Sequence, residues 1–131
     1  MIREFNIQTD RNDVKRILES SFNTTVSFDN YTNNNTVYVL EVNNTVVATA
    51  TLVIIPKFIH NGKCMGLIED VAVDESIRGK GYASLIIKEL VNKSKELNCY
   101  KVILNCNDEL VTFYEKNGFV KNGILMRVNL I

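Results

Sequence analysis

One stretch of the sequence, in which an apolar strand runs into a glycine-containing turn and then a helix, constrains the fold most. Apart from two acids, Leu67–Val73 is a near-continuous apolar run that predicts a strand. Residues from about Gly81 to Leu97 predict an amphipathic helix. The turn between them, Arg78–Ala83, therefore lies at a helix N-terminus, where free backbone N–H groups and the positive end of the helix dipole favour an anion.

The turn itself carries the backbone freedom and the charge that a pyrophosphate requires. Gly79 and Gly81 permit positive φ and close approach of the backbone to an anion, while Arg78 and Lys80 add positive charge. The spacing is neither the dinucleotide fingerprint G-x-G-x-x-G nor a P-loop, which needs Gly-Lys-Ser/Thr. Judged on Gly-x-Gly alone, an ordinary glycine-containing turn is the simpler interpretation.

The remaining periodicity predicts a single layered α/β (α+β) domain over residues 1–131. A chain of 131 residues is long enough for one core. We expect strands at Ile2–Ile7, Thr36–Val42, Thr45–Ile55, Leu67–Val73 and Tyr100–Cys106, with one or two more within Phe119–Leu130. We expect helices at Asp13–Phe22, Gly81–Leu97 and Asp108–Asn117. Asn12 or Asp10 can cap the first helix, and Asn43-Asn44 suits a hairpin turn.

Composition argues against several classes of protein. The chain has 15 basic and 15 acidic residues, interleaved along the sequence, and so lacks the basic excess typical of nucleic-acid binding. No stretch approaches the roughly 20 apolar residues that span a bilayer, and Met1–Asp10 lacks the apolar core of a signal peptide. We therefore expect a cytoplasmic protein with no membrane partner. Cys64, Cys99 and Cys106 are odd in number and lack C-x-x-C spacing, so we expect reduced thiols and no metal site.

Two motifs resemble marks of the GNAT superfamily of acyl-CoA N-acyltransferases. Arg78–Ala83 resembles the Arg/Gln-x-x-Gly-x-Gly/Ala pyrophosphate loop of that superfamily, and Phe113–Phe119 resembles its Phe-Tyr pair before a Gly-Phe strand. The resemblance implies a mixed, mostly antiparallel sheet with a splayed central strand, helices on both faces, and acetyl-CoA as cosubstrate. The implied cofactor-binding residues are Val71, Ala72, Val73, Arg78, Gly79, Lys80, Gly81, Tyr82, Ala83, Ser84 and Tyr114.

Within the superfamily, the chain most resembles the glucosamine-6-phosphate N-acetyltransferase family. The blocks that carry this resemblance are Lys57–His60, Leu67–Val73, Arg78–Gly81, Asn98–Lys101 and Phe113–Lys116. The resemblance implies acetyl transfer to the amine of D-glucosamine 6-phosphate, on the route to UDP-N-acetylglucosamine, by a homodimer with shared active sites. The implied substrate-binding residues are Thr24, Lys57, Phe58, Ile59, His60, Glu69, Asp70, Tyr100, Lys101, Asn105 and Arg127.

Glu69 and Tyr114 are the candidate catalytic residues. Acyl transfer to an amine needs a deprotonated amine and a proton for the departing thiolate. Glu69 and Asp70 are costly in a buried strand unless they have a task, so Glu69 is the candidate for orienting or deprotonating the ammonium. By resemblance, Tyr114 lies near the CoA sulfur and can protonate the thiolate. Three simpler roles stay open: a solvent-facing strand end for the acids, a packed aromatic for Tyr114, and a structural role for His60.

Three positions depart from the family pattern. Asn105 stands where relatives carry an acid, Leu110 where an asparagine commonly touches the cofactor, and Asn129 where an arginine often ends the chain. Arg127, two residues earlier on the same face of a predicted strand, can substitute for that arginine. Two alternatives therefore remain: a GNAT enzyme for another small amine or a protein N-terminus, and a catalytically silent acyl-CoA-binding module.

Overall fold

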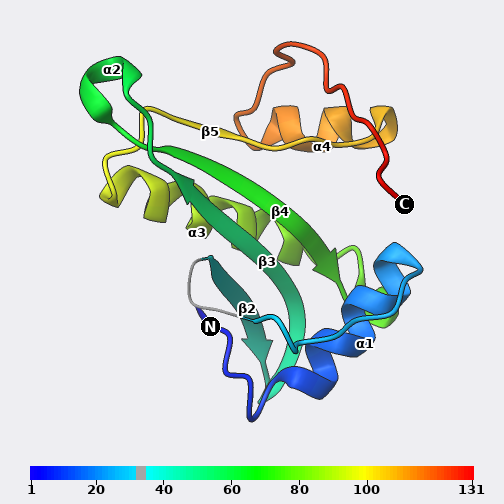
Figure 1. Cartoon of the computed structure of the whole chain (residues 1–131). Coiled ribbons are helices and arrows are strands. Elements are labelled where there is room, and N and C mark those ends of the chain that lie inside the picture. Colours follow the sequence, from blue (N-terminus) through cyan, green and yellow to red (C-terminus); the bar gives the residue numbers. More distant parts are fainter. Residues whose placement is uncertain (32–34) are drawn as a thin grey trace.

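The β-branched runs of the sequence build one five-stranded sheet (Figure 1). The computed structural model describes residues 1–31 and 35–131, so residues 32–34 lie outside the described residues. The strands are β1 (Ile2–Glu4), β2 (Thr36–Val42), β3 (Thr45–Ile55), β4 (Met65–Val73) and β5 (Lys101–Ile103), and they lie side by side in that order. The first four pair antiparallel, and β5 pairs parallel to β4, so the predicted mixed, mostly antiparallel sheet is confirmed.

The β2–β3 hairpin has the bounds that the sequence predicts. Asn43 and Asn44 form its two-residue turn, with φ of 51° and 63°. Positive φ at both central residues is the geometry of a type I′ turn, which matches the twist of the flanking strands and which asparagine tolerates. The turn therefore sets the register in which β2 and β3 begin to pair.

Helices cover both faces of the sheet, as predicted. Helix α1 (Arg11–Phe22) buries Val14 and Ile17 against one face, and α3 (Tyr82–Glu96) buries Ile86, Ile87 and Leu90 against the other. The remaining helical segments are α2 (Ile59–Gly62), α4 (Val111–Lys116) and the 3₁₀ turns η1 (Glu75–Ile77) and η2 (Asp108–Leu110). Across residues 1–31 and 35–131, no helix combines the length and apolar character needed to cross a membrane.

Strands β4 and β5 diverge soon after they begin. Strand β4 pairs with β3 along nearly its whole length, whereas its pairing with β5 covers Met65–Leu67. Beyond Leu67 the β5 side of β4 faces no strand among the described residues. The splayed central strand that the resemblance implies is therefore present, and it leaves backbone groups of β4 available.

The N-terminal strand and the first helix differ from expectation in detail. The strand ends at Glu4, because the Asn6 side chain accepts a hydrogen bond from Gln8 N at 2.9 Å and turns the chain. Asp10 precedes α1, but its carboxylate does not cap the helix. It accepts two hydrogen bonds from Arg3 instead, at 2.7 and 2.9 Å, and this charge-assisted pair ties the start of α1 to β1.

The predicted C-terminal strands are wrong. Residues 119–131, all of them described, form no strand, and the fifth strand ends at Ile103 rather than Cys106 (Figure 1). A strand needs a partner for its backbone N–H and C=O groups, and this segment meets none in the chain. Its apolar side chains are exposed instead: Val120, Ile124, Leu125, Met126, Val128, Leu130 and Ile131.

Candidate active site

A β-bulge interrupts β4 at its two acidic residues. The pairing with β3 runs from Thr51↔Glu69 to Thr49↔Ala72, so one β3 residue, Ala50, opposes two residues of β4. These two are Asp70 and Val71, and Asp70 has φ of 52°, a left-handed value that is uncommon outside glycine. Bulges of this kind bend a strand and redirect side chains, and they gather near active sites.

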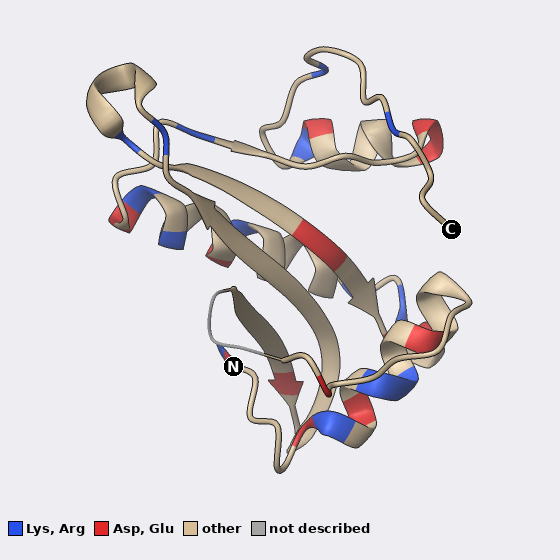
Figure 2. Ribbon diagram, in the orientation of Figure 1, with Lys and Arg blue, Asp and Glu red and all other residues tan. Residues whose placement is uncertain are grey.

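The bulge places both carboxylates on one face of the sheet. Ile68 and Val71 pack into the cluster beneath α3, whereas Ala72 packs into the cluster beneath α1. Side chains alternate along a regular strand, so Glu69, which follows Ile68, faces the α1 side. The extra residue of the bulge lets Asp70 face the same side, where it lines a cavity. Glu69 and Asp70 thus both face the α1 side of the sheet. Figure 2 shows these two acids as the red segment of β4.

The cavity beside Asp70 has a volume of about 300 Å³ and lies between α1, the chain after α1, and the sheet. Its lining combines aromatic and aliphatic side chains with several hydroxyl groups. The lining residues are Phe5, Val14, Leu18, Thr25, Val26, Ser27, Phe28, Tyr31, Val37, Thr49, Thr51 and Asp70. An apolar hollow with a few convergent polar groups is typical of a site for a small molecule.

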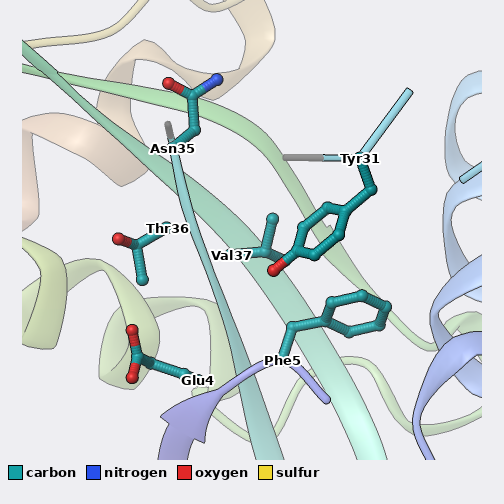
Figure 3. Close-up of a pocket in the computed structure, with 6 residues that line it drawn as sticks. All are labelled: Glu4, Phe5, Tyr31, Asn35, Thr36 and Val37. Atoms are coloured by element: carbon teal, nitrogen blue, oxygen red, sulfur yellow. The ribbon is translucent and has the colours of Figure 1, made fainter. Parts of the chain in front are cut away.

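A second cavity of about 260 Å³ adjoins the first and contains Glu4, Asn35 and Thr36 in its lining. The two cavities share Phe5, Tyr31 and Val37. Figure 3 shows the rings of Phe5 and Tyr31 next to one another, and their centroids are 5.5 Å apart in an edge-on arrangement. This aromatic pair therefore forms the shared wall between the two hollows.

The environment of Glu69 favours its protonated form. Partial burial raises the pKa of this carboxyl above its usual value, and the nearby charge of Asp70 raises it further. A carboxylate with a raised pKa is a better proton acceptor than an ordinary surface glutamate when its pKa approaches the working pH. The role of Glu69 as the basic group stays a prediction, and its raised pKa is compatible with that role.

The turn before α3 has the geometry of an anion site. Gly79 and Gly81 have φ of 86° and 79°, and no atom lies near the place where a side chain would begin. Glycine therefore allows the left-handed backbone here and lets an anion approach the backbone closely. Gly81 precedes α3, and the first intrahelical bond of this helix runs from Leu85 N to Gly81 O at 3.1 Å. The N–H groups of residues 82–84 come before that bond and point out of the helix end. Arg78 and Lys80 are exposed beside them.

Asp74 holds this turn in place, and the sequence motifs do not reveal it. It accepts hydrogen bonds from the backbone N and the Oγ of Ser76, at 3.0 and 2.8 Å, and so caps η1. It also accepts one from Arg16 of α1 at 2.8 Å. These donors, those of Ser76 first, lower the pKa of the Asp74 carboxyl below its usual value. An acid directly after an apolar strand and two residues before a serine is the local signal that would have identified it.

The splay of β4 exposes two backbone donors between the bulge and the turn. Asp74 N donates to Val47 O in β3 at 2.8 Å, so its N–H points toward β3. Successive N–H groups of a strand point to opposite sides, so those of Val73 and Val71 point toward the side from which β5 has diverged. Val71 and Val73 are among the residues that the resemblance implies for cofactor binding.

Tyr114 lies on α4 and is 8% exposed. Its ring packs edge-on against those of Phe113 and Phe119, with centroids 4.9 and 5.8 Å away. Burial, and secondarily the charge of Cys106, raises the pKa of its phenol. Asn117, at the end of the same helix, donates to Ser84 Oγ at 3.2 Å and so ties α4 to the first turn of α3. Tyr114 therefore carries a protonated phenol on a helix that is tied to the start of α3, next to the turn Arg78–Gly81, which we call the anion turn.

Three residues of the predicted substrate site, His60, Tyr100 and Lys101, lie together near the beginning of β4. His60 stacks on Tyr100 with ring centroids 4.1 Å apart, and the Lys101 Nζ lies 5.5 Å from the centre of the same ring. Tyr100 N donates to Cys64 O at 3.0 Å, which places this group beside the start of β4. The strand rises about 3.3 Å per residue, so this group is about 13 Å from Glu69 along β4.

Other predicted substrate residues are not brought to the cavity. Thr24 is exposed, and its neighbour Thr25 is the threonine that lines the cavity. Asn105 follows β5, and Arg127 lies in the irregular C-terminal segment, both exposed. The strand face that was expected to present Arg127 does not form, so that argument for its role is lost. Within the part of the chain that the structure describes, no group of three or more His, Cys, Asp or Glu residues is arranged to hold a metal ion.

Comparison with known proteins shows the family of the chain. The model of the acetyltransferase (GNAT) family matches residues 5–119. A probable glucosamine 6-phosphate N-acetyltransferase of rice (Oryza sativa subsp. japonica) is 42% identical over 83 residues, which cover 63% of this chain and 50% of the relative. The glucosamine 6-phosphate N-acetyltransferase of Trypanosoma brucei brucei is 44% identical over 85 residues, covering 65% of this chain and 58% of the relative.

A solved structure extends the similarity over the whole chain. The crystal structure of glucosamine-6-phosphate N-acetyltransferase from Arabidopsis thaliana superposes with a TM-score of 0.86 at 29% identity, and covers 100% of this chain and 98% of that one. In sequence, by contrast, the match spans between 50% and 58% of the rice and trypanosome relatives. The fold is thus shared from end to end, while the sequence similarity is concentrated in part of it.

The Asp74 contacts give a first prediction. Asp74→Asn removes the charge that Arg16 and Ser76 bind, so we expect the free energy of unfolding at pH 7 to fall by about 2 kcal/mol and CoA binding to weaken. The folded-state pKa of Asp74 lies below the ordinary 3.8. The stabilisation is therefore complete above the unfolded pKa and is lost as the pH falls through the folded pKa. Urea denaturation at pH 7 and at about pH 3 should show the difference from wild type shrink in acid.

Asp13→Asn is the matched control. Asp13 also pairs with Arg16, at 3.5 Å, but its side chain is 40% exposed and it does not contact η1. An exposed pair of this kind contributes little, so stability and CoA affinity should stay near wild type. Equal losses in the two variants would contradict a specific role of Asp74 in holding the turn.

Proposed function

The chain belongs to the GNAT acetyltransferase family, and on this basis we propose that it transfers acetyl from acetyl-CoA to the amine of D-glucosamine 6-phosphate. The products would be N-acetyl-D-glucosamine 6-phosphate and CoA. The observation that carries the proposal is the layout of β4, with a paired acidic bulge facing a cavity and an anion-binding turn following the strand. Residues 1–131 would act as one catalytic domain.

GNAT acetyltransferases use acetyl-CoA, and the chain offers a continuous track for it. We assign the pyrophosphate to the turn Arg78–Gly81 and the first-turn N–H groups of Tyr82, Ala83 and Ser84, because these donors converge at the positive end of α3. The pantetheine and thioester would lie along the open edge Val71–Val73, where backbone N–H groups point away from β3. This track needs no metal, and we propose none.

The reaction needs a proton acceptor, a hydrogen-bond donor to the carbonyl oxygen and a proton donor, and the chain offers a candidate for each. Glu69, with its raised pKa, would accept a proton from the substrate ammonium directly or through water, which frees the amine lone pair for attack. A backbone N–H of the open edge would stabilise the charge on the carbonyl oxygen. Tyr114, held protonated by burial, would donate a proton to the departing thiolate.

The substrate contacts divide between two places. Glu69 and Asp70 would face the amine and hydroxyl groups of the sugar, next to the cavity that Thr25 and Tyr31 help to line. Thr24 remains a proposed contact beside Thr25. The phosphate would be bound by cationic and polar side chains of the opposite end of β4 and of the chain beyond: Lys57, Phe58, Ile59, His60, Tyr100, Lys101, Asn105 and Arg127.

On one chain those two places are separated along β4, with the His60–Tyr100 stack about 13 Å of strand from Glu69, and this separation favours a site shared between two chains. We therefore propose a homodimer in which one subunit binds the sugar amine and its partner binds the phosphate. Exposed apolar side chains suitable for such an interface occur at Phe58 and Ile59 and along residues 120–131.

The dimer is open to a direct test by light scattering. We expect a dimer for the wild-type chain and a shift to monomer for Val128→Asp, which places a charge among the exposed apolar residues 124–131. Asn44→Asp is the control, because it adds one carboxylate at the exposed β2–β3 turn, outside residues 120–131. A wild-type monomer at micromolar concentration would overturn the proposal of shared sites.

The substrate proposal is tested by measuring CoA release with glucosamine 6-phosphate, glucosamine and a short peptide with a free N-terminus. We expect kcat/KM to be highest for glucosamine 6-phosphate and to drop by about 10²-fold or more without the phosphate, because a hydrogen-bonded charged contact is lost. Lys101→Gln should narrow that gap. Preference for the peptide would move the chain to another amine, and tight CoA binding with no acetylation of any amine would indicate a silent binding module.

Tyr114→Phe tests the proton donor. Removing the hydroxyl should lower kcat by about 10²-fold with little change in KM, because the group acts mainly in the transition state. Tyr38→Phe is the matched control, since Tyr38 also packs against the α3-side cluster and also loses only a hydroxyl. Unchanged kcat in Tyr114→Phe would leave Tyr114 as a packing residue and remove it from the chemistry.

A further inference from the structure

Two cysteines that are far apart in sequence touch at the base of the sheet. Cys64 directly precedes β4, and Cys99 lies between α3 and β5. Their Sγ atoms are 2.8 Å apart, and both side chains are only partly buried. The third cysteine, Cys106, is exposed on a different loop and provides an internal comparison.

The backbone holds this pair together. Tyr100 N donates to Cys64 O at 3.0 Å, which joins the residue before β4 to the chain just after Cys99. Cys99 N donates to Ser94 O at 3.0 Å, which fixes Cys99 at the end of α3. The parallel pairing of Met65 with Lys101 continues the same contact into the sheet. The backbone therefore holds the two sulfurs as neighbours, and they need to come closer by less than about 1 Å to reach the bonded distance of about 2.05 Å.

We propose that Cys64 and Cys99 form a reversible intrachain disulfide, with a small-molecule disulfide of the glutathione type as oxidant. The bridge would staple the start of β4 to the end of α3. This inference concerns a modification site, and it is independent of the amine on which the chain acts.

The chemistry is a pair of thiol–disulfide exchanges. The Cys64 thiolate attacks oxidised glutathione, forming a mixed disulfide and releasing one glutathione thiolate. The Cys99 thiolate then attacks the Cys64 sulfur and displaces the second glutathione. The two cysteines together lose two electrons and two protons, and one oxidised glutathione becomes two reduced ones. The Cys64–Cys99 bond forms, and the bond between the glutathione sulfurs breaks.

The surroundings order the two steps. Burial raises the pKa of the Cys99 thiol to about 12, and the hydrogen bond and charge of Cys64 contribute as well. Cys99 is therefore the poorer first nucleophile. Once Cys64 is in a mixed disulfide, its contributions to that pKa disappear, and Cys99 becomes more reactive at the moment when its attack is needed.

The disulfide would close a covalent loop that contains most of the proposed site. Residues 65–98 between the two cysteines include the acidic bulge, the anion turn and α3. Constraining so long a loop restricts the unfolded chain and raises the melting temperature. The sulfurs lie at the end of β4 opposite to the anion turn and are close together in the reduced form, so we expect the bridge to stabilise the fold.

The test equilibrates the wild-type chain in glutathione buffers of increasing oxidised fraction, then alkylates free thiols and maps them by mass spectrometry. We expect loss of two hydrogen atoms, with Cys64 and Cys99 in one cross-linked peptide, while Cys106 stays alkylated or carries glutathione. The melting temperature should rise by roughly 10 °C on bridging and return to its starting value after reduction with dithiothreitol.

Three variants define the controls. Cys64→Ser and Cys99→Ser should each abolish the bridged mass and the thermal shift, and Cys106→Ser should retain both. Alkylation of Cys64 and Cys99 in the most oxidising buffer would overturn the proposal, as would separate glutathione adducts on the two residues. A thermal shift that persists in Cys64→Ser would also refute it. Acetyl transfer measured in parallel keeps this outcome separate from the proposed function, because the bridge is scored by mass alone.

Discussion

The unequal backbone pairing of β4 is the constraint on which the rest of this site depends. On one side β4 pairs with β3 along nearly its whole length, and on the other its pairing with β5 covers three residues. Full pairing on both sides would satisfy the N–H groups of Val71 and Val73 within the sheet and leave nothing for a ligand. Strong pairing with β3 is also what supports the bulge, because the ladder resumes at Thr49↔Ala72 after the extra residue.

Two carboxylates of this one region are tuned in opposite directions by their neighbours. Glu69 is partly buried beside another acid, so its pKa is raised. Asp74 receives hydrogen bonds from Ser76 and Arg16, so its pKa is lowered. The same functional group is therefore more easily protonated in the middle of β4 and stays charged just after its end. The proton transfer proposed for Glu69 would use the first environment, and the contacts of Asp74 with η1 and Arg16 use the second.

The sequence predicts what depends on local pattern and misses what depends on distant partners. The Asn43-Asn44 hairpin and the turn before α3 follow from turn chemistry and periodicity, and both are confirmed. The prediction of strands within residues 119–131 was wrong, because the spacing of apolar residues does not show whether a pairing partner is available. Asp10 lies at the position of an N-cap, but its carboxylate accepts hydrogen bonds from Arg3 instead. The periodicity of the sequence does not predict that contact. The meeting of Cys64 and Cys99 is likewise set by topology.

The distribution of charge and apolar surface bears on whether one chain makes a complete site. The acids and the cofactor edge occupy β4 from Glu69 onward, whereas His60, Tyr100 and Lys101 cluster beside its beginning. Residues 120–131 expose a run of large apolar side chains that the chain's own sheet does not cover. Burying such a run is favourable at about 25 cal/mol per Å². A second copy that covered this segment would bury that surface and bring a cationic cluster toward the acids of its neighbour, so assembly and substrate binding would rest on the same contact.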